Sequence, residues 1–204
     1  MNFINFILQN FNTMKRIKFI LAVTAIVFVS VNAKAQDSNT DNHTVSITVP
    51  EVALADIEPA ANKNITLGFT APTEAGLPIV ANGTNNTLWL NYSSIKSTAD
   101  ATRNVSVRLN APVPGIDITV TAAAATGSGA GTLGTPSAQL ILSASDQTII
   151  SGIGSAYTGD GANNGHNLTY ALAPGSGSGS VASYADLEAT TTAVATVTYT
   201  ISDN

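Results

Sequence analysis

The side chains that most often carry out catalysis are few in this chain and poorly placed for it. There are two histidines: His43 lies in a polar leader, and His166 lies in a turn of Gly and Asn residues. Nucleophilic catalysis needs a base held in place by packing and by a third group. We therefore expect both histidines to be solvated loop residues. The chain has no cysteine, which excludes disulfides, thiol catalysis and cysteine-based zinc sites.

Two pairs of carboxylates stand two residues apart, Asp56 with Glu58 and Asp186 with Glu188. This spacing on a strand places both side chains on one face, and glycoside hydrolysis uses such a pair. Nothing in the surrounding sequence marks either pair as buried, so we expect solvated acids near strand ends. No acid–base set can be assembled, and the sequence predicts a protein that is not an enzyme.

Two loops resemble ligand-binding loops only in part. Residues 160–165 gather oxygen donors around glycine, but Ala162 occupies one calcium-donor position and no closing glutamate follows. Residues 127–131, Gly-Ser-Gly-Ala-Gly, resemble a phosphate cradle, but no basic residue is near and no helix pattern follows. We expect a plain turn in the first and a flexible loop in the second, with no metal and no cofactor.

The single tryptophan has two possible roles. Trp89 lies in a run that is apolar on both sides, which favours a place in the core. Alternatively, it contacts a glycan on a flat sheet face, together with some of the tyrosines. These are Tyr92, Tyr157, Tyr170, Tyr184 and Tyr199.

The first 35 residues have the pattern of a secretory signal peptide. A basic stretch at 15–18 precedes an apolar run at 19–31 that is short for a membrane span, and Ala33-Lys34-Ala35 forms a cleavage site. Cleavage would leave a mature chain that starts at Gln36 and has no membrane span. The whole chain has a formal net charge of −5, and four of its eight basic residues leave with the signal. Such an acidic chain is not expected to bind nucleic acid or an anionic membrane. We expect secretion, by way of the periplasm, to the cell surface.

Short alternating segments separated by turns predict an all-β fold. Thr, Ser, Asn, Gly and Val are abundant and charged residues make up only 10% of the chain, a composition typical of strands and tight turns. Turn residues recur about every ten positions, as in an antiparallel β-sandwich. We predict one sandwich domain over 44–204, preceded by a polar leader at 36–43. The expected strands cover 44–49, 52–57, 64–70, 79–80, 87–92, 104–110, 115–121, 138–143, 147–151, 167–173 and 192–201; a helical turn is possible at 122–125, and a long loop is expected at 152–165.

Residues 44–49, Thr-Val-Ser-Ile-Thr-Val, alternate without a break. Val45, Ile47 and Val49 would face one side of a strand, and the Thr and Ser residues would face the other. This segment is either the first strand of the sandwich or a strand lent to another copy of the protein by β-augmentation.

Tyr184 leads towards a terminal strand, Ala-Val-Ala-Thr-Val-Thr-Tyr-Thr-Ile at 193–201. Together with the alternating segment 44–49 after its polar leader, this layout resembles fimbrial (pilin) subunits of the chaperone–usher type, especially the disulfide-free and spore-coat-U-like branches. The chain lacks the cysteine pair and the penultimate tyrosine of that family, and Tyr199 lies further from the end.

The resemblance implies an incomplete immunoglobulin-like sandwich, completed by the N-terminal strand of the next subunit. Val45, Ile47 and Val49 would then fill pockets of a neighbour. The partners would be copies of the chain itself, a periplasmic chaperone and an outer-membrane assembly protein. The function expected is that of a structural subunit of a bacterial surface fibre or pilus. The alternative is a monomeric adhesin or carbohydrate-binding module that uses Trp89.

Overall fold

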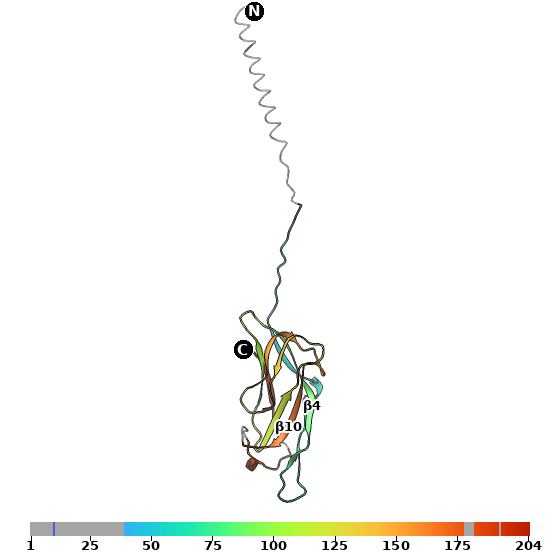
Figure 1. Cartoon of the computed structure of the whole chain (residues 1–204), viewed down its shortest axis with the longest axis vertical. Helices are drawn as coiled ribbons and strands as arrows, with labels where there is room; N and C mark the ends of the chain where they lie inside the picture. The colour runs from blue at the N-terminus through green and yellow to red at the C-terminus, as the bar shows by residue number, and fades with distance from the viewer. Residues whose placement is uncertain (1–9, 11–38, 178–181, 192) are drawn as a thin grey trace, which may run out of the picture. The chain divides into compact units, whose positions relative to one another are not determined.

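The computed structural model describes residues 10, 39–177, 182–191 and 193–204. The chain divides into two units, Met1–Ile47 and Thr48–Asn204, and the second contains every strand of the described residues (Figure 1). The expected signal peptide, apart from Asn10, lies outside the described residues. Within the described residues, no helix is long and apolar enough to cross a membrane.

The structure confirms the all-β fold class. In the part of the chain that the structure describes, nine strands form one antiparallel sheet, and two short strands form a second, β2 with β3. The strands are β1 Val52–Glu58, β2 Phe69–Thr70, β3 Val80–Ala81, β4 Thr84–Ile95, β5 Arg103–Leu109, β6 Ile116–Ala122, β7 Ala130–Pro136, β8 Leu140–Ile141, β9 Gln147–Tyr157, β10 His166–Pro174 and β11 Val197–Asp203. Two single-turn 3-10 helices, η1 Ala60–Asn62 and η2 Tyr184–Asp186, lie between them.

The large sheet folds over on itself to make two layers. One layer runs β1-β4-β10-β6-β8, and the other runs β11-β5-β9-β7. The two are joined where Ser93 and Ser94 of β4 pair with Tyr157 and Ala156 of β9. Figure 1 shows β4 beside β10 in the first layer. This antiparallel sandwich is consistent with an immunoglobulin-like arrangement.

Alternating apolar side chains from both layers fill the space between them, as the sequence predicts. Leu88, Leu90 and Tyr92 of β4 are buried, and so are Val105 and Val107 of β5. They pack with other buried residues into one core cluster. The remaining members are Leu109, Val120, Ala122, Leu142, Ile149, Ile150, Ile153, Leu168 and Tyr170.

Three of the expected strands are absent or short, and the strand expected at 192–201 begins only at Val197. Of the expected strand at 138–143, only Leu140–Ile141 pairs, with β6. Residues 44–49 form no strand and are exposed throughout. Of the expected strand at 64–70, only Phe69–Thr70 pairs, with β3. An alternating pattern makes a strand stable only where a neighbour supplies backbone hydrogen bonds, and these segments lack that neighbour along most of their length.

Three loop or turn expectations are also wrong. Glycine-rich residues 127–131 lead directly into β7, which pairs with β9, so this region is not simply a flexible loop. The expected loop at 152–165 begins with strand, because β9 continues to Tyr157. Residues 122–125 form no helical turn.

Candidate functional site

The segment 44–49 exposes three apolar side chains. Val45 is 71% exposed, Ile47 80% and Val49 66%. Single exposed apolar residues are ordinary on protein surfaces, but here three β-branched side chains recur at every second position. On a strand they would form one continuous apolar face.

The C-terminal strand β11 has one free edge. It pairs along its whole length with β5, and within the described residues no strand pairs with its other edge. Val197, Tyr199 and Ile201 face the core and are only partly buried, while the residues between them are exposed. The alternation predicted for this strand is therefore confirmed, and its second row of backbone groups is available for pairing.

The core side of β1 is also incompletely covered. Ala53 and Ala55 lie opposite Ser94 and Tyr92 of β4, which are both buried, so all four point to the same face. The two alanines are nevertheless exposed. β1 and β11 are edge strands of different layers and lie close to each other. The sandwich is thus incompletely covered on this lateral side.

Arg103 ties the ends of β1, β4 and β11 together. Its side chain is 1% exposed, and Nε lies 2.6 Å from the Asp203 carboxylate. The guanidinium also binds the Glu51 carboxylate, the Val52 carbonyl and, at 3.0 Å, the Ile95 carbonyl. Carboxylates of Glu51, Asp100 and Asp203 lie within 4.8 Å of one another. The buried guanidinium accounts for two of them without a metal ion.

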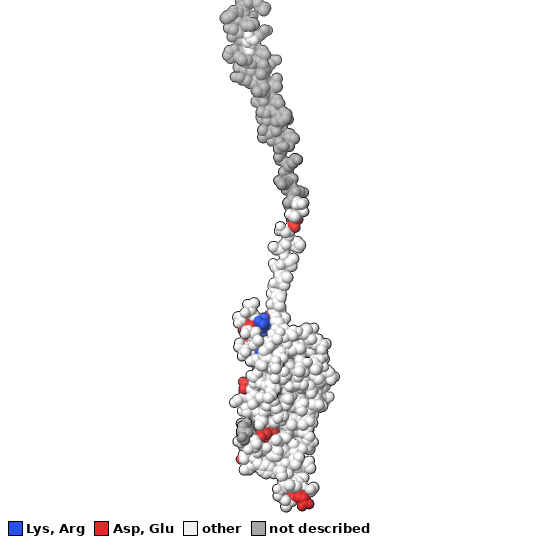
Figure 2. Space-filling view, viewed as in Figure 1, with Lys and Arg blue, Asp and Glu red and all other residues white. Residues whose placement is uncertain are grey.

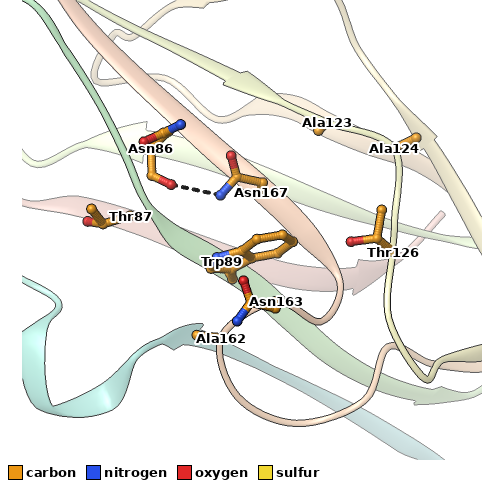
Figure 3. A pocket seen from close by; sticks show the side chains of 9 residues that line it. All are labelled: Asn86, Thr87, Trp89, Ala123, Ala124, Thr126, Ala162, Asn163 and Asn167. Atoms are coloured by element: carbon orange, nitrogen blue, oxygen red, sulfur yellow. Dashed lines mark hydrogen bonds between the residues drawn. The ribbon is translucent and has the colours of Figure 1, made fainter.

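Trp89 lies on the outer face of β4, not in the core. It is partly buried, between the buried Leu88 and Leu90. Its cross-strand neighbours are Glu58 of β1 and Asn167 of β10. It lines a surface pocket of about 510 Å³ together with eight other residues (Figure 3). These are Asn86, Thr87, Ala123, Ala124, Thr126, Ala162, Asn163 and Asn167.

The tyrosines do not join this pocket. Tyr92 and Tyr170 are buried in the core. The Tyr170 hydroxyl lies 2.6 Å from that of Tyr199, and burial raises the pKa of Tyr170 to about 12. Tyr157 and Tyr184 are exposed but line no part of the pocket. Among the described residues, Trp89 is thus the one aromatic side chain that lines the pocket.

His166 is not the solvated loop residue that the sequence suggested. It is fully buried at the start of β10. Its Nδ1 lies 2.8 Å from the Ala123 carbonyl oxygen and its Nε2 lies 2.9 Å from the Tyr92 hydroxyl. Burial lowers its pKa, and the Tyr92 hydroxyl itself donates to the Leu133 carbonyl oxygen. Both ring nitrogens thus have structural partners.

The carboxylate pairs have partners that explain them without catalysis. Asp56 forms a half-exposed ion pair with Lys63 at 2.8 Å, and that hydrogen bond lowers the pKa of Asp56. Glu58 accepts a hydrogen bond from the Ala60 amide. Asp186 caps η2 by accepting from the Ser183 amide. His43 and Glu188 are exposed.

The oxygen-rich turn at 160–165 is closed by its own hydrogen bonds. The Asn164 amide nitrogen donates to the Asp160 carbonyl at 2.7 Å, and its oxygen accepts from the Ser128 amide at 3.0 Å. Asn91, buried below, donates to the carbonyls of Gly159 and Gly161 at 2.7 and 3.2 Å. These hydrogen bonds therefore fix the turn, whose residues Ala162 and Asn163 line the pocket beside Trp89.

Sequence reasoning identified Trp89 but missed the asparagines around it. Asn86 precedes it by three residues, and Asn167 is brought beside it by the pairing of β10 with β4. One signal in the sequence was available. Asn167 is next to the apolar Leu168 on the same predicted strand, so the two side chains should face opposite sides and Asn167 should face outward. Which outward residues meet across strands depends on register, and the sequence alone does not specify it.

Comparisons with known proteins add no further evidence. No protein-family model, curated protein or solved structure matches the chain. The resemblance to pilin subunits stays a prediction.

Proposed function

We propose that the chain is a secreted structural subunit of a bacterial surface fibre, in which segment 44–49 of one copy pairs with the free edge of β11 in the next. The observation that carries this proposal is the unpaired segment 44–49 with its three exposed apolar side chains. The role is non-enzymatic. A periplasmic chaperone and an outer-membrane assembly protein would keep subunits apart until they dock.

The lengths of the two elements are compatible. At about 3.3 Å per residue, a six-residue strand spans about 20 Å. β11 has seven residues and by the same measure spans about 23 Å. A donated strand would therefore find backbone partners along its whole length.

The side chains are compatible as well. Val45, Ile47 and Val49 would cover the lateral side where Val197, Tyr199 and Ile201 are only partly buried. Fully burying each of three such side chains contributes about 1.5–3 kcal/mol. Main-chain hydrogen bonds would add affinity, and the alternation would set the register, because a shift by one residue turns Thr and Ser inward.

The test compares two substitutions that differ only in the side of the strand they alter. Ile47→Asp places a charge on the apolar side, and Ser46→Asp places the same charge on the polar side. Material sheared from cells expressing each full chain is run on a denaturing gel with and without boiling. Strand-exchanged polymers resist detergent until heated, since the inserted strand belongs to a folded core.

We expect a ladder in the unboiled lane for the unaltered chain and for Ser46→Asp, collapsing to one band on boiling. Ile47→Asp should give only monomer. A single monomer band for the unaltered chain in both lanes would overturn the proposal. So would a ladder that survives Ile47→Asp unchanged.

A further inference from the structure

The pocket around Trp89 has the size and lining of a small-ligand site. Its volume of about 510 Å³ lies within the range of about 300–1,000 Å³ found for ligand pockets. The nine lining residues are one tryptophan, three asparagines, two threonines and three alanines. None is charged. Charged side chains are also sparse on the molecular face that Figure 2 shows.

One aromatic ring lines the pocket. Trp89 projects outward from β4 and is only partly buried. Figure 3 shows its ring between the side chains of Asn167 and Asn163, with Thr126 beyond it. Ala123, Ala124 and Ala162 also line the pocket. Their short side chains leave room that a larger residue would fill.

The amide of Asn167 is oriented by the protein itself. Its nitrogen donates to the carbonyl of Asn86 at 2.8 Å and to that of Leu88 at 3.2 Å. Both amide protons are thereby used, and the side-chain oxygen is the group that Asn167 offers as an acceptor. Asn86, Asn163 and Thr126 are exposed and add an amide or hydroxyl each.

The walls of the pocket are held in place before any ligand arrives. Thr126 and Gly165 exchange two backbone hydrogen bonds of 2.9 Å, which fixes the loop after β6 to the loop before β10. The hydrogen bonds of Asn91 and Asn164 fix the turn that carries Ala162 and Asn163. A preformed site loses less conformational entropy on binding.

We propose that this pocket binds a neutral saccharide. A sugar ring has an apolar face of C–H groups and a rim of hydroxyls. The face matches the indole ring of Trp89, and the hydroxyls match the amides and the threonine hydroxyl, which donate and accept. The lining offers no cation to a phosphate or carboxylate. This inference does not depend on strand exchange, because the pocket lies within one copy.

The unaltered full chain permits a direct test, because Trp89 is its only tryptophan. The protein is applied to an array of neutral and sialylated oligosaccharides, and the best neutral binder is titrated while Trp89 fluorescence is recorded. We expect saturable binding to neutral glycans and a change in emission. Binding that leaves the emission unchanged, or no binding to any neutral glycan, would overturn the proposal. A preference for sialylated glycans would do the same.

Two variants make the test specific to the pocket. Trp89→Ala removes the aromatic ring and should weaken binding at least tenfold. Tyr157→Ala removes an exposed aromatic residue that does not line the pocket and should leave binding unchanged. Equal affinity of Trp89→Ala and the unaltered chain would refute the assignment. Trp89→Ala should not alter the unboiled ladder, so failure of one proposal is distinguishable from failure of the other.

Discussion

Replacing Arg103 by methionine tests how the ends of three strands are held together. The guanidinium is 1% exposed and binds the carbonyls of Val52 and Ile95 as well as two carboxylates. Methionine has a similar length and stays apolar, so it fills much of the space but donates no hydrogen bond. The substitution therefore isolates the loss of polar contacts from the loss of volume.

The two kinds of contact contribute differently. The Glu51 and Asp203 side chains are 49% and 54% exposed, so water can solvate them again, at a cost of about 1 kcal/mol or less each. The Val52 and Ile95 carbonyls lose a charged donor, and such bonds contribute about 1.5–3 kcal/mol each. We expect Arg103→Met to lower the free energy of unfolding by about 3 kcal/mol, near the lower end for breaking a buried ion pair.

Thermal unfolding followed by circular dichroism measures this effect. For a domain of this size, about 3 kcal/mol corresponds to a fall in Tm of about 6–12 °C. Arg108→Met is the matched control, since Arg108 lies on the same strand, is 52% exposed and approaches Asp146 only to 3.6 Å. It should cost less than about 0.5 kcal/mol. A loss below about 1 kcal/mol for Arg103→Met would refute the reasoning.

Two further predictions concern a buried base and a close backbone contact. Burial lowers the pKa of His166 in the folded state, so the unfolded chain binds its proton first. The free energy of unfolding should be constant above about pH 6.5 and fall below it, by up to about 1.4 kcal/mol per pH unit. Tm should fall with it, and His166→Gln should make Tm depend less on pH in this range. Gly131→Ala should lower Tm more than Gly152→Ala. Both glycines have positive φ, which costs about 1–2 kcal/mol for alanine, but only at Gly131 would the new methyl overlap β9.

The predictions for His166 and for Gly131 can each be contradicted by one result. A Tm of the unaltered chain that does not change between pH 7.5 and pH 5 would contradict a neutral, buried His166. Equal melting temperatures for the two alanine variants would show that β7 can move away from β9 without cost. Both Tm values are measured by thermal unfolding. The circular dichroism spectrum of each variant before heating shows whether the β-fold has formed.

Periodicity predicted the interior strands because their apolar and polar residues alternate strictly. Val105 and Val107 alternate with polar residues, and the structure places both in the core. β7 was missed because its glycines indicated a loop. Gly131 is required there because β7 and β9 approach so closely that a side chain would meet the Ser155 carbonyl. Glycine at a close approach and glycine in a loop look the same in one sequence.

The candidate sites were predicted less completely than the strands. His166 has turn residues on both sides in sequence, yet its burial depends on Tyr92, which is distant along the chain. Trp89 was recognised, but two of the three asparagines around it, Asn167 and Asn163, come from a separate strand and a separate turn. Contacts of this kind depend on strand register, which many side chains set together and no local pattern reveals.

The order of the strands along the chain has a consequence for how fast the protein folds. β5 ends at Leu109, and its edge partner β11 begins only at Val197. β4 likewise pairs with a distant strand, β10, which begins at His166. Ladders between such distant segments give a high contact order, and folding is then expected on the scale of milliseconds to seconds. During synthesis, β5 presents an uncovered edge until the last residues emerge. An unfinished chain would aggregate through that edge.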